Sequence, residues 1–352
     1  MMTKKYYKLH NFLTFSVEGE GQLPDSFDKE FAFYRTEPQV GAVNLQVVIG
    51  NFLWEPPRDS LVVNKTFILH DDTIYACDAY KVASWKIKIT GLDSECTTVQ
   101  VHGNYASKFV LARWFCESII RLKMTLSGYP MLHSSSLCNG ERGIVLAASP
   151  STGKTTTLLT WLEKGNPFLS DEYSILDNNR IWSYVTPFRF HTHNLKINPV
   201  FSRNISFLDR LQIQWRTLLL KMTRGYADVT WNINLHKVKP DVFVVQHCQL
   251  AGVFVVTRTK KDQVARLTSG LDAVIKQLQI INQFEWRGFE HYIRAWSYAH
   301  PDGRVASLDR IEKEGLTRIL KDNVFGQIHL PEKFCPKNFE EVIQVFDDLF
   351  AK

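Results

Sequence analysis

The spacing of hydrophobic and polar residues changes near residue 104, and this change divides the chain into two parts. Before it, apolar and polar residues alternate over short segments separated by turn residues, which is typical of β-strands. After it, residues 105–126 carry apolar side chains at helical spacing. We therefore expect a β-rich N-terminal domain over residues 1–104 and a mixed α/β domain over residues 105–352. The expected N-terminal strands lie in FLTFSVEGE, NLQVVIGNF, KTFILHD, TIYACD, WKIKITG and TTVQVHG.

The first part of the second domain alternates strands with a helix. Residues 131–149 predict a strand, a turn at Asn139-Gly140 and a second strand. A helix is expected over residues 154–164, with Gly165 as its C-terminal cap. Further short strands are expected in PFLSDEYSIL, RIWSYVT and FRFHTH.

The rest of the second domain combines an aromatic insertion, two strands and a helical tail. The insertion covers residues 201–240, with a helix near residues 206–222, and the strands lie in VFVVQHCQLAGVFVVTRT. From residue 269 the pattern is mostly helical. The insertion is compatible with a lid or acceptor groove, and equally with an interfacial helix pair that packs on the core or on another copy in a homo-oligomer. Its aromatic and basic residues are Trp215, Tyr226, Trp231, Arg203, Arg210, Arg216, Lys221 and Arg224.

Composition and charge narrow the classes of partner. The chain has 352 residues, of which 45% are hydrophobic, so it is long enough for one large or two modest globular domains. Its formal net charge is +6, but the Lys and Arg residues are spread out rather than gathered in an arm or block. We therefore expect no nucleic-acid partner, and a mildly basic protein suited to anions such as nucleotides.

The cysteines and the longest apolar runs indicate the compartment. Six cysteines stand singly, and none has the Cys or His spacing of a zinc site. With no signal-peptide pattern, this favours reduced thiols and a cytoplasmic location. No apolar run reaches the roughly 18 residues that are needed to span a bilayer, so no membrane span is expected.

A candidate phosphate-binding loop lies between a strand-like run, GIVLAAS, and a helix-like run, TTLLTWLEKG. Such loops need small residues so that backbone amides converge on an anion, a lysine for the terminal phosphates, and a hydroxyl for magnesium. A helix N-terminus behind the loop favours negative charge. The residues expected to contact the nucleotide are Ser149, Pro150, Ser151, Thr152, Gly153, Lys154, Thr155 and Thr156.

Ala148 departs from this pattern, because such loops usually carry a glycine there. Alanine adds little volume but loses access to positive φ. A nucleotide site is compatible with Ala148 if its backbone stays in an ordinary region. The alternative is a turn rich in Ser and Thr that caps a core helix.

The residues on either side of the loop narrow the chemistry. No DxxG or NKxD motif follows the loop, so a GTPase switch is not expected. His133 precedes the loop in MLHSSSL, and Asp171-Glu172 follows it in FLSDEYSIL. Taken alone, His133 is also compatible with a hydrogen-bonded core histidine, and Asp171-Glu172 with an exposed turn.

This order and spacing resemble the catalytic domain of HPr kinase/phosphorylase and its HPr-kinase-like relatives, a domain type related to phosphoenolpyruvate carboxykinase. The likeness is close over residues 131–177 and loose to about residue 260. Residues 1–104 and the tail from residue 269 show none. The resemblance implies an α/β fold with a P-loop catalytic domain behind a smaller β-rich N-terminal domain.

The resemblance also implies a role for each matching residue. Lys154 would contact the β- and γ-phosphates, and Thr155 would bind Mg²⁺. Asp171 matches the acid that acts as base on the acceptor hydroxyl. Glu172 matches the metal-binding acid, although the family usually has Asp there. His133 matches the family histidine near the phosphates. Phosphoryl transfer needs this positioning and charge neutralisation more than covalent help.

Other residues are weaker candidates. Arg189, in TPFRFH, can bind a nucleotide or substrate anion, with a structural ion pair as the alternative. The same two possibilities apply to Arg258 and Lys260, which follow the strand GVFVVT. His191 and His193 share one side of a strand, but no third ligand is evident, so no metal is expected there.

The sequence therefore predicts an ATP-dependent kinase that uses Mg²⁺ and phosphorylates a hydroxyl. The acceptor is expected to be a serine of a protein or peptide, including a peptide natural-product precursor, or a small molecule. The family's arginine-rich signature for phosphorolysis is not visible, which favours a one-way kinase. The alternative is a nucleotide-binding regulatory or assembly protein without transfer activity. A carboxykinase-like enzyme is a third reading, for which no oxaloacetate-binding set is visible.

Overall fold

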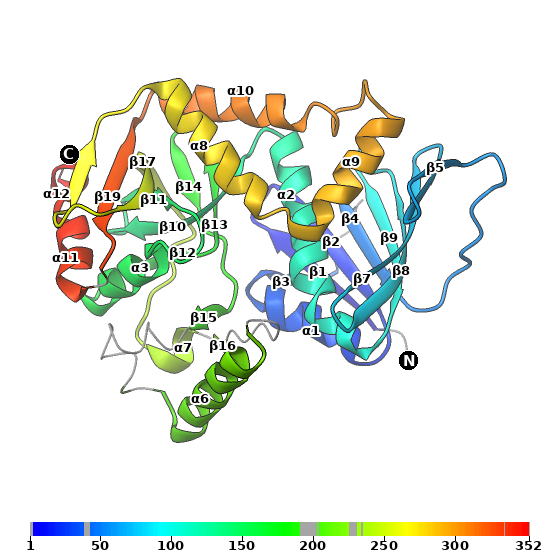
Figure 1. Cartoon of the computed structure of the whole chain (residues 1–352), viewed down its shortest axis with the longest axis horizontal. Coiled ribbons are helices and arrows are strands. Elements are labelled where there is room, and N and C mark those ends of the chain that lie inside the picture. The colour runs from blue at the N-terminus through cyan, green and yellow to red at the C-terminus, as the bar shows by residue number, and fades with distance from the viewer. Residues whose placement is uncertain are drawn as a thin grey trace. The chain divides into compact units, whose positions relative to one another are not determined.

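The chain forms two compact units in the computed structural model (Figure 1). The first unit comprises Met1–Pro130 and Gln283–Gly315, and the second comprises Met131–Asn282 and Leu316–Lys352. Each unit combines helices with a large sheet of its own, so the fold is mixed α/β. The structure describes residues 3–38, 43–190, 203, 205–224, 231–233, 235–333 and 335–351.

A nine-stranded sheet forms the first unit, in the order β3-β1-β2-β4-β9-β8-β7-β6-β5. The pairs β2–β4 and β4–β9 are parallel and the others are antiparallel. All six expected N-terminal segments contain a strand. The bounds are β1 (Thr3–Leu9), β2 (Leu13–Gly19), β3 (Arg35–Thr36), β4 (Leu45–Ile49), β5 (Leu61–Val63), β6 (Phe67–His70), β7 (Thr73–Tyr80), β8 (Ala83–Thr90) and β9 (Thr97–Gly103).

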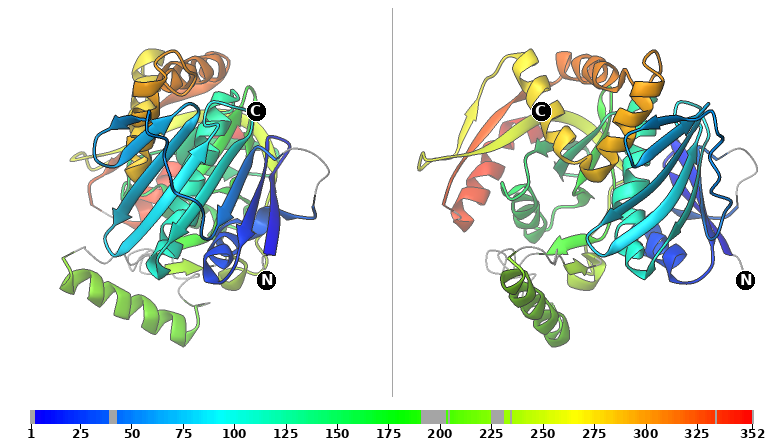
Figure 2. Two further views of the ribbon diagram at one scale, coloured as in Figure 1. Left: turned by 90° about the vertical axis from the view of Figure 1, so that its right-hand side faces the viewer. Right: turned by 45° about the vertical axis from the view of Figure 1, so that its right-hand side comes forward.

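One face of this sheet is apolar and packs against helices, because buried and exposed residues alternate along the strands. In β8, Trp85, Ile87 and Ile89 are buried, whereas Ser84 and Lys86 are exposed. The left-hand view of Figure 2 shows the strands of this sheet side by side. The helical elements are α1 (Gln22–Phe31), α2 (Glu117–Leu126), α9 (Glu290–Ala299), the short η1 (Ala32–Tyr34), η2 (Tyr105–Phe109) and η4 (Arg287–Phe289), and the π-helix η3 (Leu111–Cys116).

The division of the chain differs from the boundary expected near residue 104. The helical segment that follows β9 stays in the first unit, where every residue of α2 is buried and the ammonium group of Lys123 donates to the carbonyl of Leu92 at 3.1 Å. A distant segment returns to the same unit. There the indole of Trp296 donates to Asp93 at 2.7 Å, and the hydroxyl of Tyr292 donates to Asp78 at 3.1 Å. These buried bonds join residues far apart in sequence, which local patterns do not report.

An eight-stranded mixed sheet forms the second unit, in the order β11-β10-β13-β14-β17-β19-β18, with β12 paired to β10. Part of the sheet closes on itself because β17 also pairs with β11. Two further strands, β15 and β16, form a separate pair. The bounds are β10 (Met131–Cys138), β11 (Arg142–Ala147), β12 (Phe168–Ser170), β13 (Tyr173–Asp177), β14 (Arg180–Trp182), β15 (Phe188–Phe190), β16 (Trp231–Ile233), β17 (His247–Thr259), β18 (Ala265–Leu267) and β19 (Val324–Pro331).

Two apolar clusters form the core of this second sheet. Leu146 of β11 belongs to the cluster that includes residues of α3 and α11, whereas its neighbour Val145 belongs to the cluster that includes residues of α8 and α10. Successive strand residues point to opposite faces, so the two clusters lie on opposite faces of the sheet. The helices are α3 (Lys154–Glu163), α6 (Phe207–Met222), α7 (Leu235–Val238), α8 (Leu271–Phe284), α10 (Leu308–Lys321), α11 (Pro336–Gln344) and α12 (Asp347–Phe350).

One expectation about this unit is wrong. The stretch expected to hold two strands contains one 13-residue strand, β17, whose length lets it pair with β14, β11 and β19. The tail from residue 269 is mostly helical, as expected, but it also contributes β19, which lies between β17 and β18 in the sheet. Its alternation over VFGQIHLP is short, and its burial depends on partners distant in sequence. No helix in the described part of the chain is long and apolar enough to cross a membrane.

Candidate phosphate-binding site

The loop over residues 148–153, called here the 148–153 loop, joins β11 to α3 as expected. Ala148 is fully buried and is not among the residues with positive φ, so alanine causes no backbone strain there. The left-handed residues of the loop are instead Ser151, with φ 63°, and Gly153, with φ 116°. In the described chain, the amides of Ser151, Thr152 and Gly153 donate to no backbone carbonyl. These amides, ahead of a helix N-terminus, are therefore available to an anion.

Gly153 is required by its surroundings as well as by its φ. A Cβ atom at this position would lie 2.9 Å from Cε1 of Phe339 and 3.1 Å from Nη2 of Arg258. The phenyl ring comes from α11 and is fully packed in the core, so it has little room to move. Any side chain at residue 153 would therefore displace the loop.

Arg258 holds the 148–153 loop against the end of β19. Its Nε donates to the carbonyl of Thr152 at 2.9 Å, and its Nη1 donates to the carbonyls of Pro331 and Glu332 at 2.7 and 2.9 Å. Burial lowers the pKa of the guanidinium, yet its normal value is high enough to leave it charged. Arg258 thus fixes the loop backbone through carbonyl groups and places a positive charge beside it. Lys260 is exposed and directly follows β17, the strand that carries Arg258.

Strand order brings the other candidate residues to the end of this loop. β10 lies between β11 and β12 and is antiparallel to both, so the strand before Asp171 is not a direct parallel neighbour of β11. Consequently β11 and β12 run in the same direction and end at the same edge, where β10 begins. Ser134 pairs with Ala147 in this register. The short turn over residues 139–141 explains the antiparallel arrangement of β10 and β11, since a turn of this length joins only antiparallel strands.

Lys154 and His133 form a buried contact. Nζ of Lys154 lies 2.6 Å from Nε2 of His133, and only 8% of the lysine is exposed. Because an ammonium group has no acceptor, Nε2 accepts and the proton of the neutral ring is on Nδ1. No carboxylate in the described chain forms an ion pair with Lys154, so its charge is not neutralised by a contact within the fold. The side chain of Asn282 supports this strand, accepting from the amide of His133 at 2.8 Å and donating to the carbonyl of Met131 at 3.0 Å.

Asp171 lies against the hydroxyl groups of Thr155 and Ser135. Thr155 donates to its carboxylate, with both oxygens 3.2 Å away, and Ser135 donates to Oδ1. Burial, followed by the negative charge of Glu172, raises the pKa of Asp171 to about 6, while Ser135, Lys154 and Thr155 oppose the rise. The alternative of an exposed turn does not apply to Asp171, because the residue is buried. The structure thus brings together Thr155, Lys154, His133 and Asp171.

Glu172 occupies the turn between β12 and β13 in a left-handed conformation, with φ 75°. Its carbonyl accepts from the amide of Ser134 at 3.0 Å, which ties the turn to β10. A non-glycine residue in this region carries backbone strain on the order of 1 kcal/mol or more. Such a conformation persists when neighbouring contacts hold the turn in place. Here the hydrogen bond from Ser134 holds the turn that follows Asp171.

Several residues at this site were missed at the sequence level. Ser135 was predictable, because a strand places residues 133 and 135 on the same face. No local sequence pattern indicated the contacts of three other residues, because they come from elements distant in the chain. These residues are Asn282, Phe339 and Arg258, whose guanidinium group holds the 148–153 loop. Behind the site, buried hydroxyls satisfy one another around Ser174, whose Oγ lies 2.6–2.9 Å from those of three other serines: Ser134, Ser136 and Ser170.

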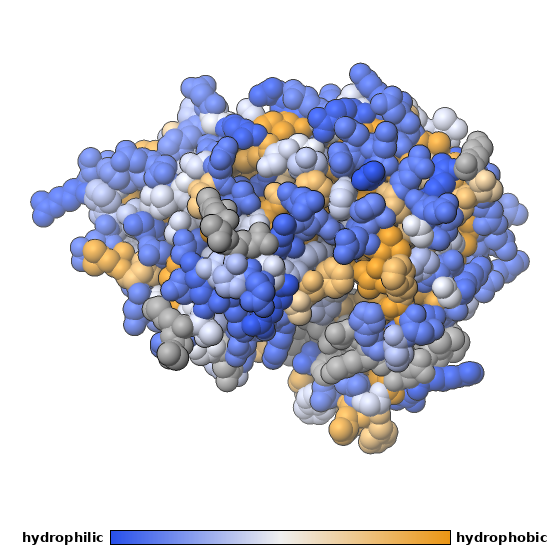
Figure 3. Space-filling model, turned by 180° about the vertical axis from the view of Figure 1, so that it is seen from behind, coloured by the Kyte–Doolittle hydropathy of each residue, from blue (hydrophilic) through white to orange (hydrophobic). Residues whose placement is uncertain are grey.

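The aromatic insertion is only partly described. The expected helix is present as α6, and Ser206 caps it by accepting from the amide of Asp209 at 3.1 Å. Among its described residues only Ile213 is buried. An apolar row on α6 is exposed, and apolar residues are visible at this part of the surface in Figure 3. The row consists of Leu208, Leu211, Trp215, Leu218 and Met222.

Other candidates in this region lie partly or wholly outside the described residues. Arg189 pairs with Asn232 in the β15–β16 ladder, but its side chain is not described. His191, His193 and Tyr226 lie outside the described residues. The backbone of Trp231 belongs to β16, and its side chain is not described. Arg203, Arg210, Lys221 and Arg224 are exposed, whereas Arg216 is half-buried.

The oxygens and amides of this site can be compared with what magnesium and nucleotide phosphates require. Within the described ranges, no group of three or more His, Cys, Asp or Glu residues could hold a metal ion. Magnesium in phosphoryl-transfer sites commonly takes one or two protein oxygens together with phosphate oxygens and water. The adjacent oxygens of Thr155 and Asp171 fit that requirement, and the amides of the 148–153 loop fit phosphate. No family model matches this sequence, and no curated protein matches it either.

Proposed function

We propose that the second unit is a P-loop kinase of the HPr-kinase-like kind, which transfers the γ-phosphoryl group of ATP to a hydroxyl. The observation that carries this proposal is the position of the Asp171 carboxylate. It is buried against Thr155, the second residue of α3, at the end of a loop whose amides are available to an anion. A carboxylate at this position can accept a hydrogen bond, and then the proton, from an acceptor hydroxyl beside the terminal phosphate.

The loop and the start of α3 bind the phosphates in this mechanism. The amides of the 148–153 loop donate to phosphate oxygens, and the helix dipole adds favourable potential. Lys154 turns from His133 to the β- and γ-phosphates, where its ammonium group neutralises charge. His133 holds the lysine in place before the nucleotide arrives.

Thr155 and Glu172 would provide oxygen ligands for magnesium. When bound, the ion neutralises charge that develops on the phosphates. Thr155 and Asp171 already have their oxygens together. Glu172 matches the family's metal-binding acid and would supply a carboxylate oxygen to the ion.

Asp171 acts as the base. A pKa of about 6 leaves the carboxylate ionised at neutral pH while keeping it basic enough to accept a proton from the acceptor hydroxyl. Ser135 and Thr155 orient it by donating to its oxygens. We propose a serine of a protein or peptide, or a small-molecule alcohol, as the acceptor.

One observation favours a second candidate function, nucleotide binding without transfer. Both oxygens of Asp171 accept hydrogen bonds from hydroxyls of the protein itself. If these bonds persist with nucleotide bound, they compete with an acceptor hydroxyl for the lone pairs of the carboxylate and lower its basicity. The chain would then be a regulatory or assembly protein.

Binding and turnover measurements test both candidates. We expect calorimetry to detect Mg²⁺-ATP binding that Lys154→Ala weakens by at least tenfold, since charged hydrogen bonds are worth about 1.5–3 kcal/mol. We expect labelled γ-phosphate to move to serine-containing peptides or alcohols. Binding without transfer to any acceptor would favour the second candidate, and unchanged ATP affinity in Lys154→Ala would refute both.

A further inference from the structure

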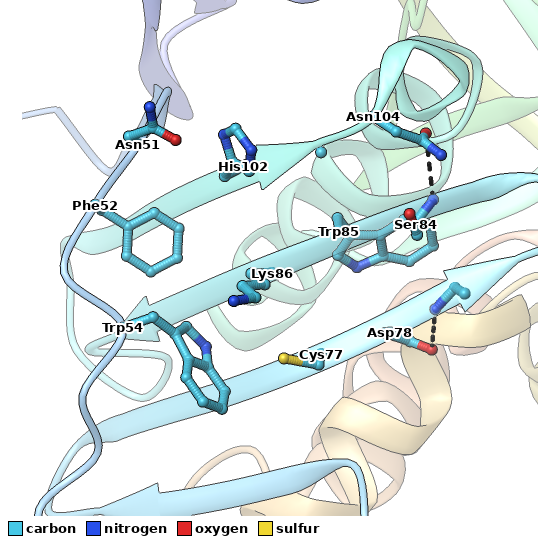
Figure 4. A pocket seen from close by; sticks show the side chains of 12 residues that line it. Asn51, Phe52, Trp54, Cys77, Asp78, Ser84, Trp85, Lys86, His102 and Asn104 are labelled. Carbon is cyan, nitrogen blue, oxygen red and sulfur yellow. Dashed lines mark hydrogen bonds between the residues drawn. The ribbon is translucent and has the colours of Figure 1, made fainter.

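A groove of about 890 Å³ lies on the first unit's sheet, over β7, β8 and β9 (Figure 4). Its volume is in the range of small-molecule sites. Among its lining residues, Phe52 and Trp54 come from the segment after β4, and Cys77, Lys86 and His102 come from the strands. The groove is formed entirely by residues of the first unit.

The floor of the groove is a row of side chains on one face of the sheet. Lys86 is directly opposite Cys77 on β7 and opposite His102 on β9. All three are exposed, whereas Trp85 and Ile87, the neighbours of Lys86 in β8, point to the apolar face. Figure 4 shows Lys86 between Cys77 and His102, with the ring of Trp54 beside them. The lysine therefore stands at the centre of the floor.

The aromatic wall of the groove carries a hydrogen-bond donor with no partner. Trp54 Nε1 is shielded from solvent and has no acceptor within the described chain. A buried donor left in this state costs on the order of 1–3 kcal/mol. Nζ of Lys86 lies 5.6 Å from the centre of the Trp54 ring, a cation–π contact that leaves its three N–H groups free to donate. A ligand oxygen that enters beside Lys86 and displaces the atoms covering Nε1 would accept from both groups.

Lys86 is the charged group of the groove that remains available to a ligand. Lys86 forms no ion pair with any described residue. Asp78, the carboxylate at the groove, accepts from Tyr292 at 3.1 Å and from the amide of Ala79 at 2.8 Å, so its oxygens are engaged. The ammonium group of Lys86 is therefore available to a ligand carboxylate, whereas the Asp78 carboxylate is already hydrogen-bonded within the first unit.

We propose that this groove binds an organic carboxylate attached to an aromatic or other planar apolar group. Lys86 and Trp54 Nε1 bind the carboxylate, and the rings of Phe52 and Trp54 contact the apolar part. The carboxylate belongs either to a free aromatic acid or to an acidic residue beside an aromatic one in a peptide. This inference is independent of the proposed kinase function, because it concerns residues of the other unit.

Protection of Cys77 from alkylation tests the proposal on the full chain. The probes are indole-3-acetate, its neutral amide, and the peptide acetyl-Phe-Asp-amide. We expect at least one of the two acids to slow the reaction of Cys77 with iodoacetamide, read by mass spectrometry of its peptide. Cys96 and Cys335, which are exposed elsewhere, serve as internal controls. Protection by the free acid alone or by the peptide alone identifies the source of the carboxylate.

Two variants separate the proposed contacts from non-specific binding. Lys86→Gln should weaken the acid's affinity by about tenfold or more, whereas Lys65→Gln, a change to an exposed lysine outside the groove, should not alter it. Trp54→Phe keeps a ring, removes the donor and should weaken the acid more than the amide. Absence of protection by both acids, equal protection by the amide, or equal effects of the two lysine variants would overturn the proposal. ATP binding is unaffected by either outcome, so failure here is distinguishable from failure of the proposed function.

Discussion

Lys154 and Lys86 each stand beside a ring, but they represent two different ways to prepare a cation for an anion. Lys154 is buried, contacts an imidazole nitrogen and sits among hydroxyls that satisfy a neighbouring carboxylate. Lys86 is exposed, lies near an indole ring and has an unsatisfied donor beside it. Around Lys154, hydrogen bonds within the fold compensate for the desolvation of the buried polar groups. Around Lys86, only a bound ligand would provide the missing hydrogen bonds. Changes at the buried site should therefore alter stability and function together, whereas changes at the groove should alter binding alone.

The largest effect is expected for Asp171→Asn. The amide keeps the shape of the carboxylate but cannot accept the proton, so the proposed phosphoryl transfer should fall by about 10²–10⁴. ATP affinity should stay nearly intact when measured by calorimetry. Near-normal transfer in this variant would remove Asp171 as the base, and His133 would be the next residue to test.

The same variant should become more stable at neutral pH. The folded-state pKa of Asp171, about 6, lies above the value of 3.8 that is usual for an exposed aspartate, so ionisation disfavours the fold. This cost is absent below about pH 4, grows between pH 4 and 6, and is complete above. Asp171→Asn should thus gain up to about 3 kcal/mol over the wild type at pH 7.5, less the hydrogen bonds it loses, and little at pH 4. Urea denaturation at both pH values measures this, and a gain independent of pH would contradict it.

Gly153→Ala should have the next largest effect. The added Cβ meets Phe339 and Arg258, so the 148–153 loop must shift, and ATP affinity should fall by about tenfold or more. Gly165→Ala is the matched control, because Gly165 also has positive φ, at 85°, but no atom within 4 Å of an added Cβ. The control should lose about 1 kcal/mol of stability and keep its ATP affinity. Equal affinity in the two variants would show that loop geometry is not critical.

A smaller effect is expected for Ser135→Ala, which removes a donor to the carboxylate. The Ser135 hydrogen bond lowers the pKa of Asp171, so its loss should raise that pKa by about one to two units. The acidic limb of the transfer rate, near pH 6 in the wild type, should move to higher pH by the same amount. Ser136→Ala, on the opposite strand face, is the control, and an identical shift in both would assign the effect to altered packing.

The smallest effect is expected for Glu172→Gly. Glycine adopts φ 75° without strain, so the free energy of unfolding should rise by roughly 1 kcal/mol. The proposed kinase should then need more Mg²⁺, because a metal-binding carboxylate is gone. Glu172→Gln separates the two effects, since it keeps the strain and loses the charge. Both variants lose the repulsion between Glu172 and Asp171, so a gain in Glu172→Gly no larger than that in Glu172→Gln would show that strain is not the cause.

Local patterns were enough for a limited part of this protein. The β11–loop–α3 segment, the caps at Ser206 and Gly165, the turn at Asn139-Gly140 and the six N-terminal strands follow from short-range rules. Such elements depend on backbone conformation and on burial of one face over a few residues, both of which are written in consecutive positions. For the same reason the candidate loop, with Lys154 and Thr155, was recognisable before any contact was known.

Only the tertiary structure decided which distant residues complete each site. Strand order placed β10 between β11 and β12, and so brought Ser135 to Asp171 and His133 to Lys154. It also introduced β19 between β17 and β18 and brought Gln283–Gly315 back to the first unit. The groove around Lys86 arises in the same way, from a segment after β4 that lines three later strands. These features depend on strand pairing and burial between residues that are far apart in the chain. The free energy of such contacts is determined by the whole fold, so no single segment shows a periodic pattern that predicts them.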